Sequence, residues 1–306
     1  IIVGGGDNRV LAGLSNDELT STYGNDVVLG DNGEFTYVNN ILVKVVSSET
    51  TLGGIDTLNL GEGDNVVIAG QDSDIVNAGS DNDIVLGDNG EINFDAAGVI
   101  TDIQSTATDQ GGDDKITLID GNNIVIAGFG SDQVATSNGA DDVIGDNGVI
   151  EYVNGSAVRL ATNDGVVSTT GVDTIIVGDG DNRVLAGLSN DEVTSTNGVD
   201  VVLGDNGELN FINNVLVNAT SSEASAGGDD ILVLGEGRNA VIAGSGVDTI
   251  TTLSSADTII GDNGQLVWSA TGIIESVTAT DLTNGAGDII NAGDGDNIIV
   301  GATGND

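Results

Sequence analysis

Aspartate or asparagine recurs every nine residues through most of the chain, and this spacing restricts the fold more than any other feature of the sequence. Val, Ile or Leu stands two residues after almost every one, and Gly stands four or five residues after most of them. Gly supplies the positive φ of a turn, Asp and Asn hydrogen-bond within turns, and β-branched residues favour strands. Each nine-residue unit is therefore predicted to be a turn followed by a very short strand. The four complete blocks are Asp56, Asn65, Asp74, Asp83; Asp114, Asn123, Asp132, Asp141; Asp173, Asn182, Asp191, Asp200; and Asp230, Asn239, Asp248, Asp257, with partial sets Asn8, Asp17, Asp26 and Asp288, Asn297, Asp306 at the ends.

Such short strands must stack on one another to bury their apolar side chains. Apolar residues nine positions apart form a continuous core only if two units make one coil of 18 residues, with a strand on each side. The 48 glycines exclude a helical fold. The predicted fold is all-β, a parallel β-roll or β-solenoid with about 18 residues per coil.

Two longer repeats lie above the nine-residue one. The tetrapeptide Gly-Asp-Asn-Gly begins at Gly30, Gly87, Gly145, Gly204 and Gly261, which defines repeats of 57 to 59 residues. Residues 175–217 nearly copy residues 1–43, an offset of 174 residues or three repeats. We expect one repeat array over 1–306, with units at approximately 1–53, 54–111, 112–170, 171–227 and 228–285 and a partial unit at 286–306. The chain is interpreted as a processed form or a segment of a longer array.

The nine-residue pattern fails once in every repeat, directly after Gly-Asp-Asn-Gly. The position due for Asp is apolar there, and two alternating segments with a short turn between them follow, as in 91–94, 95–98 and 99–103. This pattern predicts a β-hairpin insertion that either interrupts the roll or lies upon it. The apolar residues are Phe35, Ile92, Ile150, Leu209 and Leu266. The aspartates at the exit are Asp31, Asp88, Asp146, Asp205 and Asp262, which are predicted either to bind metal or to cap the turn.

The charge of the chain points to cations as its partners. There are 49 Asp and Glu against 6 Lys and Arg, a formal net charge of −43, which would repel nucleic acid and anionic membranes. The chain has no Cys and no His, so only oxygen ligands are available, and these suit Ca²⁺. No apolar run approaches the ~18 residues of a membrane span. We therefore expect calcium binding, no nucleic-acid binding and no membrane insertion.

The repeats resemble the RTX, or haemolysin-type, calcium-binding nonapeptide family, whose pattern is G-G-x-G-x-D-x-U-x with U apolar. Residues 69–77 (AGQDSDIVN) and 78–86 (AGSDNDIVL) match this pattern, and the match covers roughly 60% of the chain. The resemblance implies multiple Ca²⁺ ions, roughly two or more per repeat, held between successive coils by aspartates and turn carbonyls. Carried over to this chain, Asp56 stacks with Asp74 and Asn65 with Asp83. The candidate ligands are Asp17, Asp26, Asp56, Asp74, Asp83, Asp114, Asp132, Asp141, Asp173, Asp191, Asp200, Asp230, Asp248, Asp257 and Asp288, the exit aspartates Asp31, Asp88, Asp146, Asp205 and Asp262, and Asn65, Asn123, Asn182 and Asn239.

Two features depart from the family pattern or stand outside it. Asn replaces Asp at the second position of every complete block, so these sites carry less charge and either bind calcium more weakly or form a hydrogen-bonded Asn ladder without an ion. One aromatic residue also recurs in each hairpin, either to cap the hairpin against the roll or to form an adhesive stripe. These aromatic residues are Tyr37, Phe94, Tyr152, Phe211 and Trp268.

The function predicted from the sequence is structural. We expect a calcium-stabilised rod or filament-forming segment of a large extracellular surface or matrix protein that self-associates. The alternatives are the ligand-binding region of an adhesin and the calcium-dependent secretion module of a toxin or enzyme. The resemblance implies export through type I secretion and folding on meeting external calcium. We expect no enzyme activity, because catalysis needs one exceptional constellation and this chain offers five equivalent copies.

Overall fold

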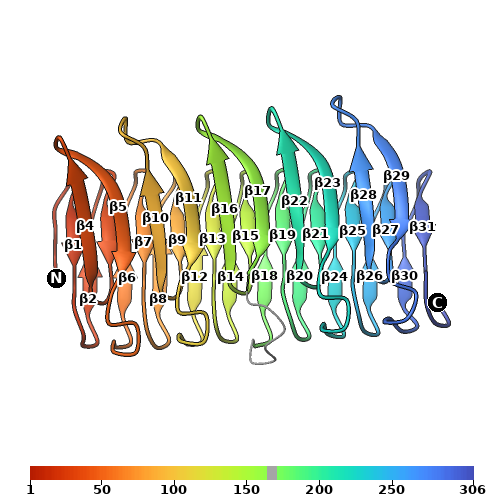
Figure 1. Cartoon of the computed structure of the whole chain (residues 1–306), viewed down its shortest axis with the longest axis horizontal. Coiled ribbons are helices and arrows are strands. Elements are labelled where there is room, and N and C mark those ends of the chain that lie inside the picture. The colour runs from red at the N-terminus through yellow and green to blue at the C-terminus, as the bar shows by residue number, and fades with distance from the viewer. Residues whose placement is uncertain (164–170) are drawn as a thin grey trace.

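The computed structural model describes residues 1–163 and 171–306 and consists of three sheets that run the length of an elongated molecule (Figure 1). Two sheets are parallel and form the coils of a roll, which confirms the predicted β-roll class. The described residues contain no helix, and so no helix there could cross a membrane. The end of the third predicted unit, 164–170, lies outside the described residues.

The outer sheet of the roll has ten parallel strands, and each strand begins directly after an aspartate of the nine-residue pattern. Its strands are β2 (Glu18–Thr20), β6 (Thr57–Asn59), β8 (Ile75–Ala78), β12 (Lys115–Leu118), β14 (Gln133–Ala135), β18 (Thr174–Ile176), β20 (Glu192–Thr194), β24 (Ile231–Val233), β26 (Thr249–Thr251) and β30 (Ile289–Asn291).

The middle sheet has eleven parallel strands on the other side of each coil. Its strands are β1 (Arg9–Leu11), β3 (Val27–Leu29), β7 (Val66–Ile68), β9 (Ile84–Leu86), β13 (Ile124–Ile126), β15 (Asp142–Ile144), β19 (Arg183–Leu185), β21 (Val201–Leu203), β25 (Ala240–Ile242), β27 (Thr258–Ile260) and β31 (Ile298–Val300).

The hairpin sheet has ten antiparallel strands, two from each repeat. Its strands are β4 (Gly33–Val38), β5 (Ile41–Ser47), β10 (Gly90–Phe94), β11 (Ile100–Ser105), β16 (Gly148–Val153), β17 (Ser156–Thr162), β22 (Gly207–Ile212), β23 (Val215–Ser221), β28 (Gly264–Trp268) and β29 (Ile274–Ala279).

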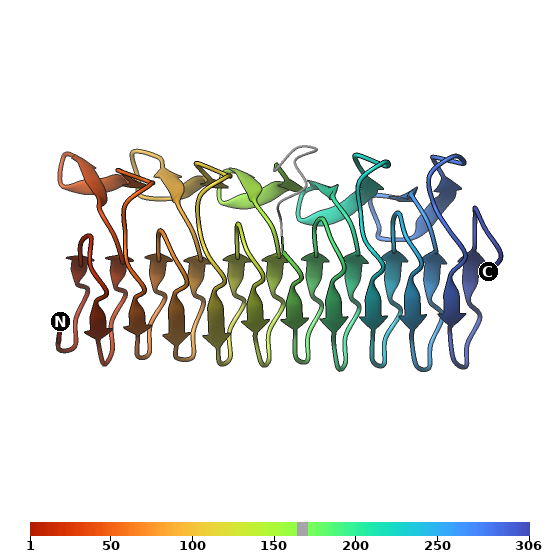
Figure 2. The ribbon, with the colours of Figure 1, turned by 90° about the horizontal axis from the view of Figure 1, so that it is seen from below.

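Strand register shows that the hairpins lie upon the roll and do not interrupt it. Within a repeat, Ile75 pairs with Thr57, which is 18 residues earlier, and across a hairpin Lys115 pairs with Ile75 in the same parallel register. Neighbouring hairpins also pair with each other, as Asn93 does with Lys44. The hairpins thus form a continuous row along one side of the roll (Figure 2).

Two hydrophobic cores hold the three layers together. The first core lies inside the coils and is built from the central residue of each short strand, such as Leu58 and Val67. The second core joins the middle sheet to the hairpins, where Leu86 and Ile92 are fully buried. The apolar residue that breaks the nine-residue pattern is therefore a core residue, since Ile92, Ile150, Leu209 and Leu266 are all fully buried here and Phe35 packs against the same cluster.

Glycine in the turns allows successive coils to approach closely. Gly139 has φ of 143°, and a Cβ at this position would lie 1.7 Å from the carbonyl oxygen of Gly121 in the preceding coil. Any side chain would therefore push the coils apart. Close contact between successive coils therefore requires glycine at turn positions such as Gly139.

Candidate metal centre

One turn edge of the roll carries an unbroken row of aspartates, which we call the all-Asp ladder. In each step the backbone N–H of one aspartate donates to Oδ1 of the aspartate one coil further on, at 2.7 Å from Asp56 to Asp74. The hairpins do not interrupt the row, because Asp74 N–H donates to Asp114 Oδ1, 40 residues away, at the same 2.7 Å. The members are Asp17, Asp56, Asp74, Asp114, Asp132, Asp173, Asp191, Asp230, Asp248, Asp288 and Asp306.

The opposite turn edge alternates Asn and Asp, and we call it the mixed ladder. The same backbone hydrogen bond joins its members, at 3.0 Å from Asn65 N–H to Asp83 Oδ1. The predicted stacking of Asp56 with Asp74 and of Asn65 with Asp83 is thus present as a hydrogen-bonded step in each ladder. The members are Asn8, Asp26, Asn65, Asp83, Asn123, Asp141, Asn182, Asp200, Asn239, Asp257 and Asn297.

The second carboxylate oxygen of most ladder aspartates is buried without a hydrogen-bond partner among the described residues. A buried polar oxygen without a partner is costly, so a row of such oxygens fits a site for a cation. On the all-Asp ladder these oxygens belong to Asp56, Asp74, Asp114, Asp132, Asp173, Asp191, Asp230, Asp248 and Asp288. On the mixed ladder they belong to Asp26, Asp83 and Asp257, whereas the Asp141 carboxylate interacts with the hydroxyl of Thr136 and Oδ2 of Asp200 accepts a hydrogen bond from Ser195 Oγ at 2.6 Å.

Burial without a counter-charge raises the pKa of the ladder carboxyls. Desolvation, with repulsion from neighbouring aspartates, raises the pKa of Asp74 to about 9 and that of Asp230 to about 10. Burial also raises the pKa of Asp83 on the mixed ladder to about 7, but there the repulsion comes from the turn residues Asp64 and Asp81 and not from ladder neighbours. The all-Asp ladder is thus the more strained of the two electrostatically.

No basic side chain neutralises the ladders in the described part of the chain. The ion pairs found there join Lys44 to Glu91, Arg159 to two glutamates of the hairpin sheet, and Arg183 to Asp142, and none includes a ladder residue. The negative charge of the ladder carboxylates therefore requires protons or a bound cation.

The donor set around these oxygens fits a hard cation. At Gly30, a Cβ would lie 2.6 Å from Asp56 Oδ2 and 2.3 Å from the Ala69 carbonyl oxygen, so a carboxylate and a carbonyl converge over the glycine. Gly87 has the same arrangement with Asp114 and Ala127. Ca²⁺ takes six to eight oxygens and accepts backbone carbonyls among them. In residues 1–163 and 171–306 no three acidic side chains form a metal-binding group.

The exit aspartates lie beside the all-Asp ladder and cap turns. Asp88 Oδ1 accepts the N–H of Gly112 at 3.0 Å, where the chain returns from the hairpin, and its Oδ2 accepts the N–H of Phe129 in the next coil. Asp31 makes the equivalent bonds to Gly54 and Gln71. The turn-capping role of these residues is therefore directly visible, and Asp146, Asp205 and Asp262 accept backbone N–H groups in the same way. Metal binding by these five aspartates stays a prediction.

Sequence reasoning missed a second row of side chains, one residue before many of the ladder positions. In this row the hydrogen bonds run in the opposite direction: Asn82 N–H donates to Asp64 Oδ1 and Asn122 N–H to Asn82 Oδ1, both at 2.9 Å. The row is exposed and joins successive turns on their outer side. Its signal in the sequence is the frequent Asp, Asn or Ser directly before the ladder residue.

The aromatic residue of each hairpin mostly covers the roll. Phe211 is buried in the second core, and Phe94, Tyr152 and Trp268 pack against it, whereas Tyr37 is 48% exposed. Arg183 lies over the ring of Phe211, 4.7 Å from its centroid. Capping of the hairpin against the roll therefore describes four of the five aromatic residues.

Comparison with known proteins identifies one match. The chain matches the family model described as RTX calcium-binding nonapeptide repeat (4 copies) over residues 2–34, 50–90, 119–149, 167–207, 242–265 and 283–306, which together are more than half of its length. No curated protein and no solved structure matches it significantly. The matched ranges contain most members of both ladders.

Proposed function

Because the chain belongs to the RTX calcium-binding nonapeptide repeat family, whose repeats bind Ca²⁺, we propose that it forms a calcium-stiffened rod within a large extracellular surface or matrix protein. Repeats of this family are typical of secreted bacterial proteins. The proposed location is the cell surface or the extracellular matrix, reached by type I secretion.

The observation that carries the proposal is the unbroken stacking of all three sheets. In the described residues each roll strand pairs with the strands of the coils before and after it, and each hairpin pairs with the next hairpin, so the units form one continuous array. A solenoid of this kind is a one-dimensional object whose length grows with the number of repeats. Such a molecule suits a spacer or a filament.

Calcium would make the stiffness of this rod depend on location. Without metal, the aspartates stacked in the all-Asp ladder repel each other across successive coils. Each coil offsets this repulsion with little apolar burial, because each of its short strands buries mainly one central side chain in the core. If each site had a Kd near 0.1 mM, calcium at about 100 times that concentration would stabilise the fold by ~2.7 kcal/mol per site. The sum over many sites is large enough to switch the chain between unfolded before export and rigid outside the cell.

Electron microscopy of the purified chain tests the proposal. In millimolar calcium we expect straight rods, and end-to-end or side-by-side association if the rod polymerises. In chelator we expect expanded chains without rods. Compact globular particles in calcium, or rods that are equally abundant in chelator, would contradict the proposed function.

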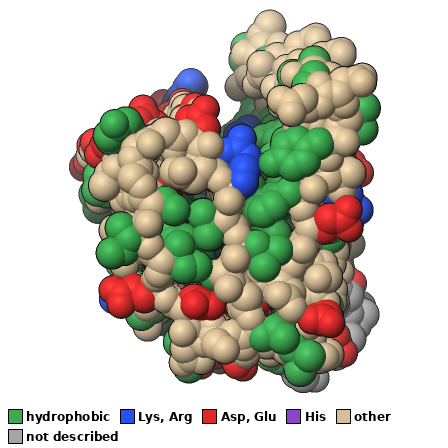
Figure 3. Space-filling view, turned by 90° about the vertical axis from the view of Figure 1, so that its left-hand side faces the viewer, with side chains coloured by type: hydrophobic (Ala, Val, Ile, Leu, Met, Phe, Trp, Pro, Cys, Tyr) green, Lys and Arg blue, Asp and Glu red, His purple; other side chains and the backbone are tan. Residues whose placement is uncertain are grey.

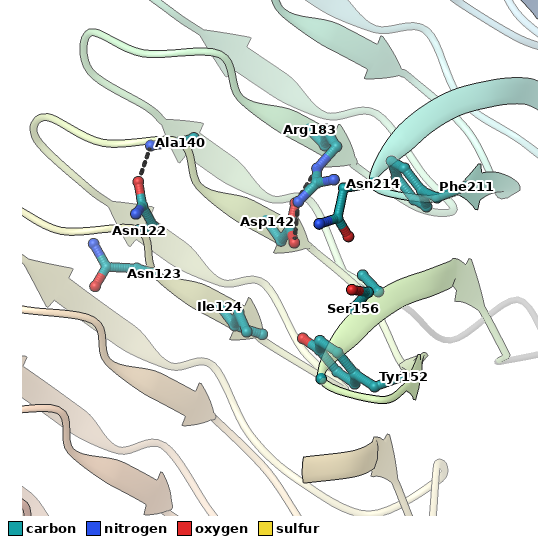
Figure 4. A pocket seen from close by; sticks show the side chains of 12 residues that line it. Asn122, Asn123, Ile124, Ala140, Asp142, Tyr152, Ser156, Arg183, Phe211 and Asn214 are labelled. Atoms are coloured by element: carbon teal, nitrogen blue, oxygen red, sulfur yellow. Dashed lines mark hydrogen bonds and ion pairs between the residues drawn. The ribbon is translucent and has the colours of Figure 1, made fainter. Parts of the chain in front are cut away.

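A second candidate function, adhesive binding of a glycan, is favoured by a groove between the hairpin turns and the mixed ladder. The groove has a volume of ≈ 720 Å³ and includes Phe211, Trp268 and Arg238 in its walls. It adjoins a smaller cavity of ≈ 260 Å³ in which the Arg183–Asp142 pair faces the hairpin that bears Tyr152 (Figure 4). At the N-terminal end, hydrophobic side chains gather in the hollow between the projecting hairpin and the roll (Figure 3). Binding of the calcium-loaded chain to a glycan array, abolished in Trp268→Ala, would support this candidate.

A further inference from the structure

The orientation of the Asn amides in the mixed ladder is fixed by the backbone. The N–H of Asp26 donates to Oδ1 of Asn65 at 3.1 Å, so the oxygen of this amide must face the preceding coil. Asp141 N–H fixes Asn182 in the same way, at 3.1 Å. Because one end of each amide accepts a backbone N–H, its NH₂ group is left to face the remaining acceptors.

Those acceptors are two backbone carbonyls and a carboxylate. Asn65 Nδ2 donates to the turn carbonyls of Gly63 at 2.8 Å and Gly61 at 3.2 Å, and to Oδ1 of Asp83 in the next coil at 2.9 Å. Asn182 repeats the arrangement with the carbonyls of Gly178 and Gly180 and with Asp200. One NH₂ group thus joins two carbonyls and a carboxylate across the gap between two coils. These are the oxygen types that Ca²⁺ prefers.

An aspartate cannot make these bonds, because an ionised carboxylate has no hydrogen to donate. On the all-Asp ladder, Oδ1 accepts the backbone N–H just as Asn Oδ1 does, but the second atom of the side chain is an oxygen that remains without a partner in Asp74 and Asp132. The same position therefore holds a donor on one ladder and an unsatisfied acceptor on the other.

We propose that the bridging side-chain amides of the mixed ladder, those of Asn65 and Asn182, replace Ca²⁺ in the gap between their own coil and the Asp coil that follows it. The mixed ladder then binds fewer ions than the all-Asp ladder and stays ordered with less calcium. This inference rests on the proposed function in one respect, namely that the folded roll holds calcium along the all-Asp ladder.

Counting bound calcium on the full chain tests the inference. The variant Asn65→Asp/Asn182→Asp removes two amide bridges and introduces a carboxylate at each position. Equilibrium dialysis with atomic absorption should show about two more ions per chain than in the wild type. The matched control is Asn40→Asp/Asn213→Asp, which adds the same charge at exposed hairpin turns and should bind the wild-type number.

A second variant removes the amide without adding charge and covers the case in which the Asp variant does not fold. Asn182→Ala should bind no additional calcium and should lower the melting temperature by a similar amount at low and at saturating calcium, because the lost interaction is not an ion site. An unchanged count in a folded Asn65→Asp/Asn182→Asp variant, or fewer bound ions in Asn182→Ala, would overturn the inference. A wild-type chain that binds no calcium at all would instead refute the proposed function.

Discussion

The two turn edges of the roll are built from the same nine-residue motif, yet they differ in one atom of one side chain. On the all-Asp ladder that atom is a carboxylate oxygen, which is buried and unpaired in nine successive coils. On the mixed ladder it is an amide nitrogen in every second coil, where it donates to carbonyls of its own turn, as Asn65 does. The same backbone hydrogen bond joins successive coils at both edges, so this side-chain difference changes how much each edge needs a cation.

The all-Asp edge carries two kinds of aspartate, which differ in how their carboxylate oxygens are paired. Ladder aspartates leave one oxygen unpaired, whereas the exit aspartate Asp88 uses both of its oxygens to accept backbone N–H groups. The exit aspartate therefore closes the hairpin onto the roll through hydrogen bonds of its own. Position in the turn, and not residue type, divides the carboxylates with two paired oxygens from those with one unpaired oxygen.

Removal of calcium is expected to have the largest effect, because it leaves the all-Asp ladder unneutralised along its whole length. In excess chelator, circular dichroism should lose most of its β-sheet signal and the cooperative melting transition should disappear. Calcium should restore both, and magnesium should restore much less, since Mg²⁺ demands a tighter octahedral geometry. A spectrum and melting point that do not change in chelator would show that the all-Asp ladder does not need calcium.

Acid should partly replace calcium in the metal-free chain. Burial raises the pKa of Asp74 to about 9 and of Asp191 to about 8, far above the ~4 of an unfolded aspartate, so the folded state binds more protons across this window. Stability contributed by these groups is present below about pH 4 and is lost as pH rises through their folded pKa values. In chelator, lowering the pH from 8 to 5 should therefore increase β-sheet content. The control is 1 M NaCl at pH 8, which screens exposed charges but should not reproduce the gain. A metal-free chain with less structure at pH 5 than at pH 8 would contradict this account.

A matched pair of substitutions compares the ladders directly. Asp132→Asn places an amide on the all-Asp ladder, where it should lose about one bound ion and increase the β-sheet content that the chain keeps in chelator, because it removes a buried charge and adds a donor. Asp141→Asn makes the same change on the mixed ladder and should alter the calcium count less. Equilibrium dialysis, and circular dichroism of both variants in chelator, provide the measurement. Equal calcium losses in the two variants would show that the edges are equivalent.

The smallest effect is expected from the exit aspartates. Asp88→Ala removes the acceptors of the N–H groups of Gly112 and Phe129 and should cost about 1–3 kcal/mol in the free energy of unfolding at saturating calcium. Asp109→Ala, an exposed aspartate of the same repeat, is the control and should change stability little. Chemical denaturation in calcium measures both. A loss of bound calcium in Asp88→Ala larger than in Asp132→Asn would assign the exit aspartate to the metal site.

The nine-residue spacing was sufficient to predict the coils, because a side chain buried once per strand can find partners only by stacking. It also predicted the hairpins, since the apolar residues at Ile92 and Leu209 break the ladder pattern and begin alternating segments. The sequence did not show the row of side chains before the ladder, because hydrogen bonds between Asn82 and Asn122 span 40 residues and leave no local pattern beyond polar composition.

The sequence by itself determined the period, the strand length, the place of each hairpin and the residue type at every turn. Only the tertiary structure decided that Asp74 continues to Asp114 and not to Asn123, and therefore that one edge is entirely aspartate. The physical reason is that the hairpin folds back over the middle sheet and returns to the edge it left, where Asp88 holds the re-entering Gly112. The edge to which a residue belongs after a hairpin depends on where the chain re-enters the roll. That place is set by packing between layers and by hydrogen bonds between residues far apart in the sequence.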